Sequence, residues 1–245
     1  MAQFFNDFTQ YTLDTFPSDW LAFTEATGGG VVDERHLRVL DLGTEAVGSG
    51  RGLKFDSGAE TGNYIRAYIW DAIASGADFE VYYRFQITAS FYSEVQGAVR
   101  QDFSGGVLNW YQGGPRSGDD LDLNKYISGS FSNLANDTSK DWVNENNWQL
   151  CRFQVSGSTL KVKIWDDGSS EPAGWDVTDT DTDLTSGKVG IVTYRDRVFY
   201  VSNFGVGTNG DTAPNSAPVT GPNTPINPSI TNLLATSARL NWEQG

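Results

Sequence analysis

The stretch WQLCRFQVSGSTLKVKIW, residues 148–165, decides the fold class of this chain. Apolar and polar side chains alternate on both sides of Ser156-Gly157-Ser158, and such alternation indicates half-buried strands. Two alternating runs around a short Gly-containing turn predict a β-hairpin. Cys151 alternates with Phe153 and Val155, so we expect its thiol to be a small buried apolar group.

Short β-like runs recur along the rest of the chain, with turn residues between them. Eight Trp, ten Tyr, fourteen Phe and 27 Gly suit twisted sheets joined by tight turns. Apolar stripes at helical spacing do not extend beyond about ten residues. The sequence therefore predicts an all-β, two-sheet jelly-roll sandwich. The further strands expected are 37–42, 52–55, 63–70, 79–88, 97–103, 107–112, 189–194 and 198–206.

The composition changes at the C-terminal end of this predicted sandwich, which covers residues 1–206. Residues 207–228 are rich in Pro, Asn, Thr and Gly, which is typical of an extended linker. Residues 229–245, SITNLLATSARLNWEQG, resemble the first two strands of a fibronectin type III domain. Because two strands cannot bury a sandwich core alone, we expect a truncated module and a fragment of a longer protein.

The net charge of −14 argues against a nucleic-acid partner, because binding to phosphates requires an excess of Lys and Arg. Apolar runs are too short for membrane insertion, and the N-terminal residues lack the pattern of a signal peptide. A single cysteine excludes an intrachain disulfide framework. We therefore expect no nucleic-acid partner, no membrane insertion and no signal peptide.

The order of features from residue 146 onward resembles a known family. A Trp-led strand, a Gly hairpin, KVKIWDDGSSEPAGW, an Asp/Thr stretch, LTSGKVGI and a terminal FGV follow one another. This order resembles the C-terminal half of concanavalin A-like lectin/glucanase jelly rolls, close to laminin-G-like domains. FFNDFTQYTLDTFPSDW at 4–20 and DFEVYYRFQI at 78–87 resemble the opening and a central strand of these modules. The resemblance spans residues 4–206 and implies a fold rather than an activity.

A row of aspartates occupies alternate positions in TDTDTD, residues 178–183. In an extended strand Asp179, Asp181 and Asp183 would stand about 6.6 Å apart. That spacing overlaps the roughly 6.5–9.5 Å between the carboxyl groups of inverting glycosidases. A general acid needs apolar burial, however, and this segment has no large apolar residue between Val177 and Leu184. We interpret the row as a solvated edge or turn, with calcium binding at Asp179 and Asp181 as the alternative.

Other acidic and nucleophilic residues give no catalytic set. SGDDLDL at 117–123 supplies Asp119, Asp120 and Asp122 as further calcium candidates, but neither acidic run matches an EF-hand loop. The glucanases that the sequence resembles use a Glu-x-Asp-x-x-Glu strand motif, which this chain lacks. His36 has no Ser or Cys at a spacing that supports a catalytic pair. The chain is predicted not to be an enzyme and to need no cofactor.

Strand alternation places several aromatic and arginine side chains opposite the predicted core faces. Aromatic planes stack on the C–H face of a sugar ring, while Arg donors meet its hydroxyl groups. We interpret these side chains as a sugar-binding surface; the alternative is that loops or a neighbouring subunit cover them. The candidate residues are Tyr82, Arg84, Arg100, Trp165 and either Trp110 or Tyr111, because adjacent residues on a strand point opposite ways.

These observations predict a non-catalytic recognition or adhesion module that binds a cell-surface glycan. The resemblance implies a phage tail fibre or capsid appendage on the virion surface, with other virion proteins as partners. An extracellular bacterial multidomain protein is the alternative setting. The alternative functions are a structural virion decoration or spacer domain and, as an enzyme, a glycoside hydrolase.

Overall fold

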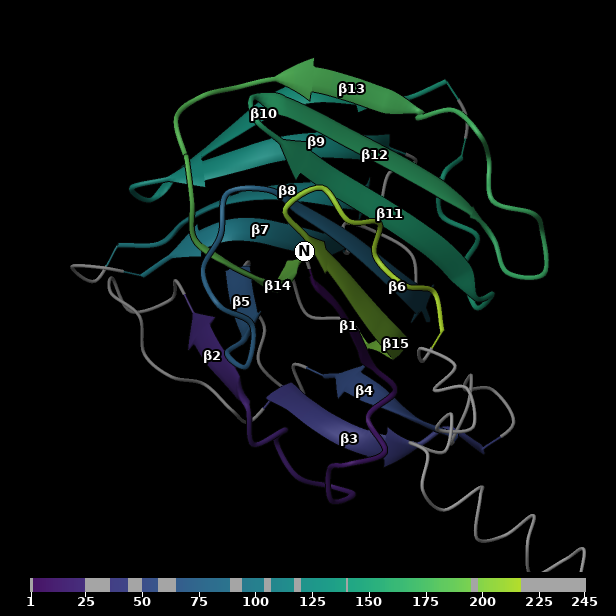
Figure 1. Cartoon of the computed structure of the whole chain (residues 1–245). Helices are drawn as coiled ribbons and strands as arrows, with labels where there is room; N and C mark the ends of the chain where they lie inside the picture. Colours follow the sequence, from purple (N-terminus) through teal and green to yellow (C-terminus); the bar gives the residue numbers. More distant parts are fainter. Residues whose placement is uncertain are drawn as a thin grey trace, which may run out of the picture.

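The computed structural model describes residues 2–24, 36–43, 50–56, 65–88, 94–103, 107–116, 120–139, 141–194 and 198–216. Their strands form two antiparallel sheets that pack face to face (Figure 1). This arrangement confirms the predicted all-β sandwich. The fibronectin-like stretch 229–245, most of the predicted linker and Asp119 lie outside the described residues. Among the residues described, no helix has the length and apolar character needed to cross a membrane.

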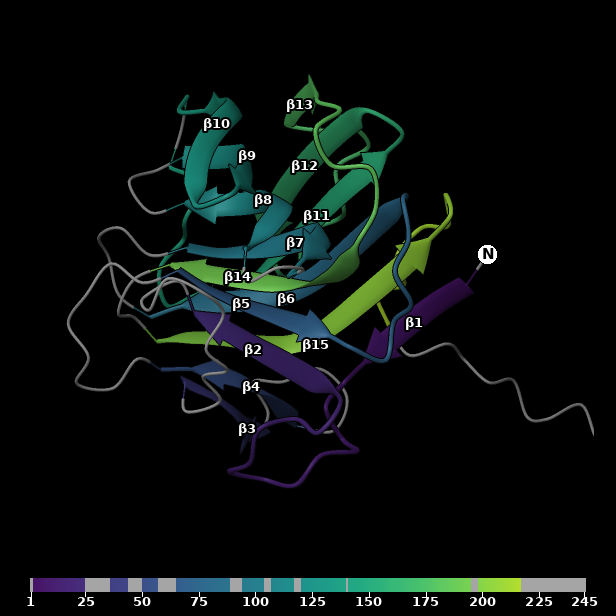
Figure 2. The same ribbon diagram turned by 90° about the vertical axis from the view of Figure 1, so that its left-hand side faces the viewer.

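The two sheets hold neighbouring strands that are often far apart in the sequence. Sheet A has the order β13 (Val177–Thr180), β12 (Thr159–Asp166), β11 (Gln149–Ser156), β6 (Phe79–Ile87), β15 (Phe199–Thr208), β4 (Arg51–Phe55), β3 (Leu37–Asp41), and β1 (Ala2–Asn6) also pairs with β15. Sheet B has the order β10 (Ser130–Asp137), β9 (Asp120–Ile127), β8 (Asn109–Arg116), β7 (Glu94–Asp102), β14 (Lys188–Tyr194), β5 (Ile65–Trp70), β2 (Trp20–Thr24). In Figure 2 both sheets descend in these orders. The chain crosses repeatedly between them, as in a jelly roll.

The hairpin predicted from residues 148–165 is present as β11 and β12, which pair from Gln149–Asp166 to Ser156–Thr159 around Gly157. The predicted core face of β6 is also confirmed. Its alternate residues Phe79, Val81, Tyr83, Phe85 and Ile87 are all buried in the main core. Cys151 is fully buried, as expected, and burial raises the pKa of its thiol to about 12.

Close packing of the two sheets depends on two glycines of sheet B. Gly97 and Gly113 are paired neighbours on β7 and β8. A Cβ atom on Gly113 would lie 2.4 Å from the ring of Phe153, and one on Gly97 would lie 2.5 Å from the side chain of Val81. The missing side chains therefore leave a hollow in sheet B that the core residues of sheet A fill.

The end of the sandwich beside β13 is closed by a carboxylate that links the sheets. Asp181, just after β13, accepts hydrogen bonds of 2.5 Å from the hydroxyl of Tyr111 and from the ammonium of Lys125 in sheet B. Burial alone would raise the pKa of Asp181, but the hydrogen bonds from Lys125 and Tyr111 outweigh burial and lower it. The ionised carboxylate is therefore the form that the folded state favours.

The chain remains part of the sandwich beyond residue 206, where the linker was expected to begin. β15 ends at Thr208, and Ala213 is buried against sheet A.

We predict that Gly113→Ala destabilises the protein, because its Cβ atom would collide with Phe153. Overpacking of a core costs about 1–3 kcal/mol, which corresponds to a fall in Tm of roughly 3–10 °C for a domain of this size. Thermal unfolding followed by circular dichroism measures this fall. The control is Gly174→Ala, whose Cβ atom would have no neighbour within 4 Å, and it should leave Tm unchanged. Equal Tm values for the two variants would contradict the packing argument.

We also predict that Asp181→Asn destabilises the protein at pH 7, by roughly 1–3 kcal/mol for lost charge-assisted bonds. Because the pKa of Asp181 is lowered in the folded state, its stabilisation is full above the ordinary aspartate pKa and disappears as the pH falls through the lowered value. The difference in Tm between wild type and variant should therefore be constant above about pH 5, shrink as the pH falls below the ordinary aspartate pKa, and vanish only below the lowered pKa of the folded state. Asp179→Asn is the control, because it removes the charge of a side chain that accepts a hydrogen bond from the Thr180 amide and still leaves an oxygen there to accept it. A difference that stays constant with pH would rule out this role of the carboxylate.

Candidate functional site

The structure places the predicted ligand-binding residues in separate environments. All six are buried, so none forms the exposed surface that alternation implied. Tyr82 and Trp165 do lie together on the outer face of sheet A, with ring centroids 6.1 Å apart. They are covered by Ala213, which packs with them and with Leu150 in one apolar cluster.

Arg84 lies on the same face but is fully engaged by the protein. Its guanidinium donates to Asp167 at 2.6 Å and 2.9 Å and to the Ser202 hydroxyl at 3.1 Å. It also lies over the ring of Trp148, 4.0 Å from the centroid. These contacts tie β6 to the turn after β12, which is a structural role.

Arg100 points away from the outer surface because its backbone has a φ of +53°, in an irregular part of β7. Its guanidinium donates to the carbonyl oxygens of Ala77, Leu184 and Gly157 at 2.6–2.7 Å. Tyr111 lies in the core between the sheets and contacts Asp181. The expectation that one of Trp110 and Tyr111 is exposed is therefore wrong, since both are completely buried.

The outer face of sheet A is closed by ion pairs. Arg152 pairs with Glu80 and with Glu171, and Lys163 pairs with Glu171 at 2.7 Å. The ammonium of Lys163 also donates to the carbonyl of Pro172 at 2.7 Å. The loop after β12 thus folds back over the strands, which corrects the prediction that this face offers an open sugar-binding surface.

The aspartate row does not form along a strand, because β13 ends at Thr180. The Lys125 ammonium forms ion pairs with the carboxylates of Asp181 and Asp183, each at 2.5 Å. Asp179 accepts a hydrogen bond from the Thr180 amide. Asp120 and Asp122 lie on β9, where Asp122 is paired with Arg116. Within the part of the chain that is described, no group of three or more His, Cys, Asp or Glu side chains could hold a metal ion.

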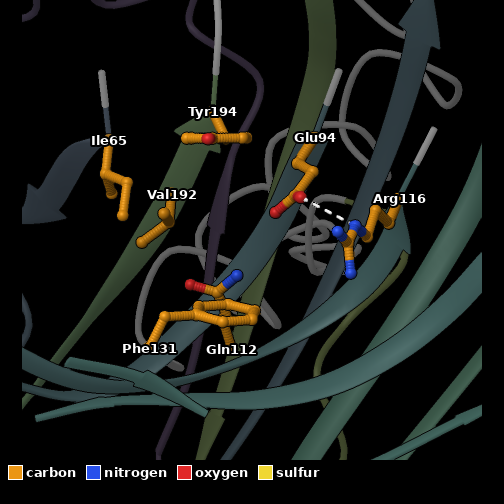
Figure 3. A pocket seen from close by; sticks show the side chains of 7 residues that line it. All are labelled: Ile65, Glu94, Gln112, Arg116, Phe131, Val192 and Tyr194. Atoms are coloured by element: carbon orange, nitrogen blue, oxygen red, sulfur yellow. Dashed lines mark ion pairs between the residues drawn. The ribbon is translucent and has the colours of Figure 1, made fainter. Parts of the chain in front are cut away.

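The outer face of sheet B contains a cavity of about 190 Å³, which we call the sheet B cavity. Figure 3 shows Tyr194 and Phe131 on opposite sides of it, with the Glu94–Arg116 pair along another side. Its lining comes from strands β5, β14, β7, β8 and β10 and comprises Ile65, Glu94, Gln112, Arg116, Phe131, Val192 and Tyr194. The site therefore combines two aromatic rings and two aliphatic side chains with three polar ones.

Arg116 is the centre of the charged side of the sheet B cavity. Its Nε lies 3.3 Å from Glu94 and its Nη1 lies 3.4 Å from Asp122, so one guanidinium serves two carboxylates. Burial raises the pKa of Asp122 above its ordinary value, and the Oδ1 atom of this residue has no hydrogen-bond partner. The two carboxylates are thus held by the protein rather than presented to solvent.

A ladder of side-chain amides fixes the floor of the sheet B cavity. The indole of Trp110 donates to Gln112 Oε1 at 2.5 Å, and Gln112 Nε2 donates to Gln96 Oε1 at 2.5 Å. Trp110 itself stacks on Tyr126, with ring centroids 4.4 Å apart. Trp110 is the one predicted site residue that supports this cavity, and it acts by orienting Gln112.

A second cavity, of about 370 Å³, lies beside the ends of β11 and β12. Its lining includes Trp165 and Trp142 together with Asp141, Asn144 and Asp166. Asn144 and Gln149 donate to Asp166 over 3.5 Å and 3.3 Å, which are long hydrogen bonds. This cavity has no exposed aromatic ring comparable to Phe131.

Sequence reasoning missed the residues of the sheet B cavity, because it did not predict the hairpin of β9 and β10. A signal was present. Leu121 and Leu123 alternate with polar residues, and Ser128-Gly129 forms the turn, with φ values of +51° and +81°. This pattern matches the Ser-Gly turn of the hairpin at 148–165.

Comparison with known proteins supports the fold and leaves the activity open. No protein-family model and no curated protein sequence matches the chain. In shape it is similar to a β-glucanase from Bacillus licheniformis, with a TM-score of 0.53 and 10% identity, over 85% of this chain and 98% of that one. It is also similar to the carbohydrate-binding module CBM66 from Bacillus subtilis, with a TM-score of 0.46 and 14% identity, over 61% of this chain and 82% of that one. The Ca²⁺/Man3GlcNAc-bound exoplasmic/lumenal domain of VIP36 is similar as well, with a TM-score of 0.46 and 10% identity, over 72% of this chain and 85% of that one. The chain thus has a concanavalin A-like jelly-roll fold.

Proposed function

We propose that this chain is a non-catalytic carbohydrate-recognition module and that the sheet B cavity holds the sugar. The observation that carries the proposal is the position of Phe131. Among the large apolar side chains that the described residues expose, Phe131 is the only aromatic one, at 44%, and it borders the cavity. A flat exposed ring beside polar groups is what the C–H face of a sugar requires for stacking.

The polar groups of the cavity supply the hydrogen bonds that a sugar needs. Gln112 uses one of its two amide protons on Gln96, which leaves the other for a ligand hydroxyl. Arg116 contacts the two carboxylates through Nε and Nη1, and its side chain is 36% exposed, so a guanidinium with five N–H donors can also donate to a ligand. These donors are already oriented by the protein, which reduces the entropy lost on binding.

The size of the cavity suits a small part of a glycan. At about 190 Å³ it is smaller than the roughly 300–1,000 Å³ of pockets that enclose drug-sized ligands. We therefore propose that it holds a single sugar ring, with the rest of the glycan outside.

The arrangement of carboxylates supports binding over hydrolysis. A glycosidase needs one carboxyl group to donate a proton and a second that is free to attack the sugar or activate water. In this site Glu94 and Asp122 are both held by Arg116. Glycoside hydrolysis remains the alternative activity that the binding experiment also tests.

We propose a phage tail or capsid appendage on the virion surface as the setting, with other virion proteins as partners. Its support is the resemblance of residues 4–206 to modules of such proteins and of secreted bacterial multidomain proteins. A structural decoration or spacer domain in the same setting is the alternative, and it would bind no glycan.

We predict that the full chain binds a subset of oligosaccharides on a glycan array and that Phe131→Ala weakens this binding at least about tenfold, since aromatic contacts at the centre of a site are worth about 2 kcal/mol. β-Glucan oligosaccharides belong in the set because a β-glucanase shares the fold. The control is Leu13→Ala, which truncates another exposed apolar side chain, 39% exposed and away from the cavity lining.

The two variants should have the Tm of the wild type, so that a loss of binding reports the site. Equal affinity of Phe131→Ala and wild type would exclude the sheet B cavity. Shortened oligosaccharides after incubation, measured by mass spectrometry, would favour the hydrolase. Absence of any binding by folded wild type would favour the spacer.

A further inference from the structure

The outer face of sheet A carries a short segment of the chain's own C-terminal region. In Figure 1 the segment that follows β15 turns back in front of β11 and β6. Its central residue, Ala213, is 1% exposed and packs against Tyr82, Leu150 and Trp165. The aromatic residues therefore form a small apolar pocket that accommodates one methyl group.

The backbone of this segment is recognised by a buried pair of opposite charges. The amide of Ala213 donates to Glu80 Oε1 at 3.0 Å, and Arg152 Nη1 donates to the carbonyl of Ala213 at 2.9 Å. Glu80 and Arg152 also pair with each other, with side chains that are each 5% exposed. Gln3 adds a hydrogen bond of 2.7 Å to the carbonyl of Thr212. Hydrogen bonds to charged groups are about twice as strong as neutral ones. The amide and the carbonyl of Ala213 are therefore both held by strong hydrogen bonds.

Two glycines of β15 make room for the segment. A Cβ atom on Gly205 would lie 2.0 Å from the carbonyl oxygen of Pro214, and one on Gly207 would lie 2.1 Å from that of Asp211. Any other residue at these positions would push the backbone of the segment off the sheet. The strand is thus shaped for close approach by another stretch of backbone.

We infer that the outer face of sheet A is a peptide-docking site, and that the chain fills this site with its own residues 211–214. The specificity follows from the contacts. The Glu80–Arg152 pair recognises one backbone amide and one carbonyl, and the pocket of Tyr82, Leu150 and Trp165 admits a small side chain between them. Glycines 205 and 207 admit the flanking backbone. The ligand class is a short peptide of the type Thr-Ala-Pro.

The intramolecular arrangement sets a limit on the affinity. A tethered segment has an effective concentration of about 1 mM near its site. Because the segment is seated, the intrinsic dissociation constant for the same peptide must be below that value, and separate peptide should therefore saturate an emptied site at low millimolar concentration or less.

The test uses the full chain with Ala213→Arg, whose long charged side chain cannot enter the apolar pocket. The peptide Gly210–Ser216 is titrated into this variant, and tryptophan fluorescence follows binding because Trp165 lies at the site. We expect half-saturation at or below about 1 mM. Wild type should bind the peptide at least about twofold more weakly than the variant, because its own segment competes at an effective concentration of about 1 mM. The peptide with Arg in place of Ala213 should not bind.

The far-ultraviolet circular dichroism of the Ala213→Arg variant must match that of the wild type, which shows that the variant is folded. If the folded variant is not saturated by about 10 mM peptide, which is ten times the effective concentration, the inference is overturned. Hydrogen exchange on the wild type provides a test that does not depend on the variant. The amide of Ala213 should exchange at least about 100-fold more slowly than those of Asn215 and Ser216, since it is buried and bonded to Glu80. Exchange of Ala213 at the rate of its neighbours would likewise overturn the docking site.

Discussion

The buried ion pair between Arg152 and Glu80 is the interaction on which the surfaces of this protein depend. Taking two charges out of water is expensive, and the cost is offset only when their remaining hydrogen-bonding groups are also satisfied. Glu171, in the loop after β12, accepts a hydrogen bond from Arg152, and Gln154 on β11 donates one to Glu80. The backbone amide of Ala213 donates a further hydrogen bond to Glu80. Burial would lower the pKa of Arg152, but Glu171 and Glu80 more than compensate and raise it. The pair thus requires that two distant segments cover sheet A.

The covering of sheet A determines where a ligand can bind. On the outer face of sheet A, aromatic and charged side chains hold the loop after β12 and the C-terminal segment. Those that are buried there are Glu80, Tyr82, Arg84, Arg152, Lys163 and Trp165. The outer face of sheet B retains both an exposed aromatic ring and donors with unused capacity, at Phe131, Gln112 and Arg116. The outer face of sheet A is therefore used for contacts within the protein, and the outer face of sheet B carries the proposed glycan site.

The sequence predicted those features that depend on neighbours along the chain. Alternation identified the hairpin at 148–165 and the core face of β6, because a strand that is half buried shows its period locally. It failed for the site, whose residues meet only through the order of five strands in sheet B. Alternation also assigns a side of the sheet and not its solvent exposure, so Tyr82 and Trp165 were placed on the correct face and yet are covered. Arg100 departs from alternation because its positive φ turns its side chain inward, and an arginine in the sequence does not predict a positive φ.

The distribution of charge connects these structural details to the choice of partner. Lysines and arginines are already outnumbered, 17 against 31 acidic residues. The basic side chains of Arg84, Arg100, Arg152 and Lys163 are each buried and bonded to carboxylates or carbonyl oxygens inside the protein. The field that a partner meets is therefore dominated by carboxylates, and it repels polyanions at long range. A neutral sugar is not repelled by this field, and the proposed site, with a phenyl ring, an amide and a partly neutralised guanidinium, is suited to that class of ligand.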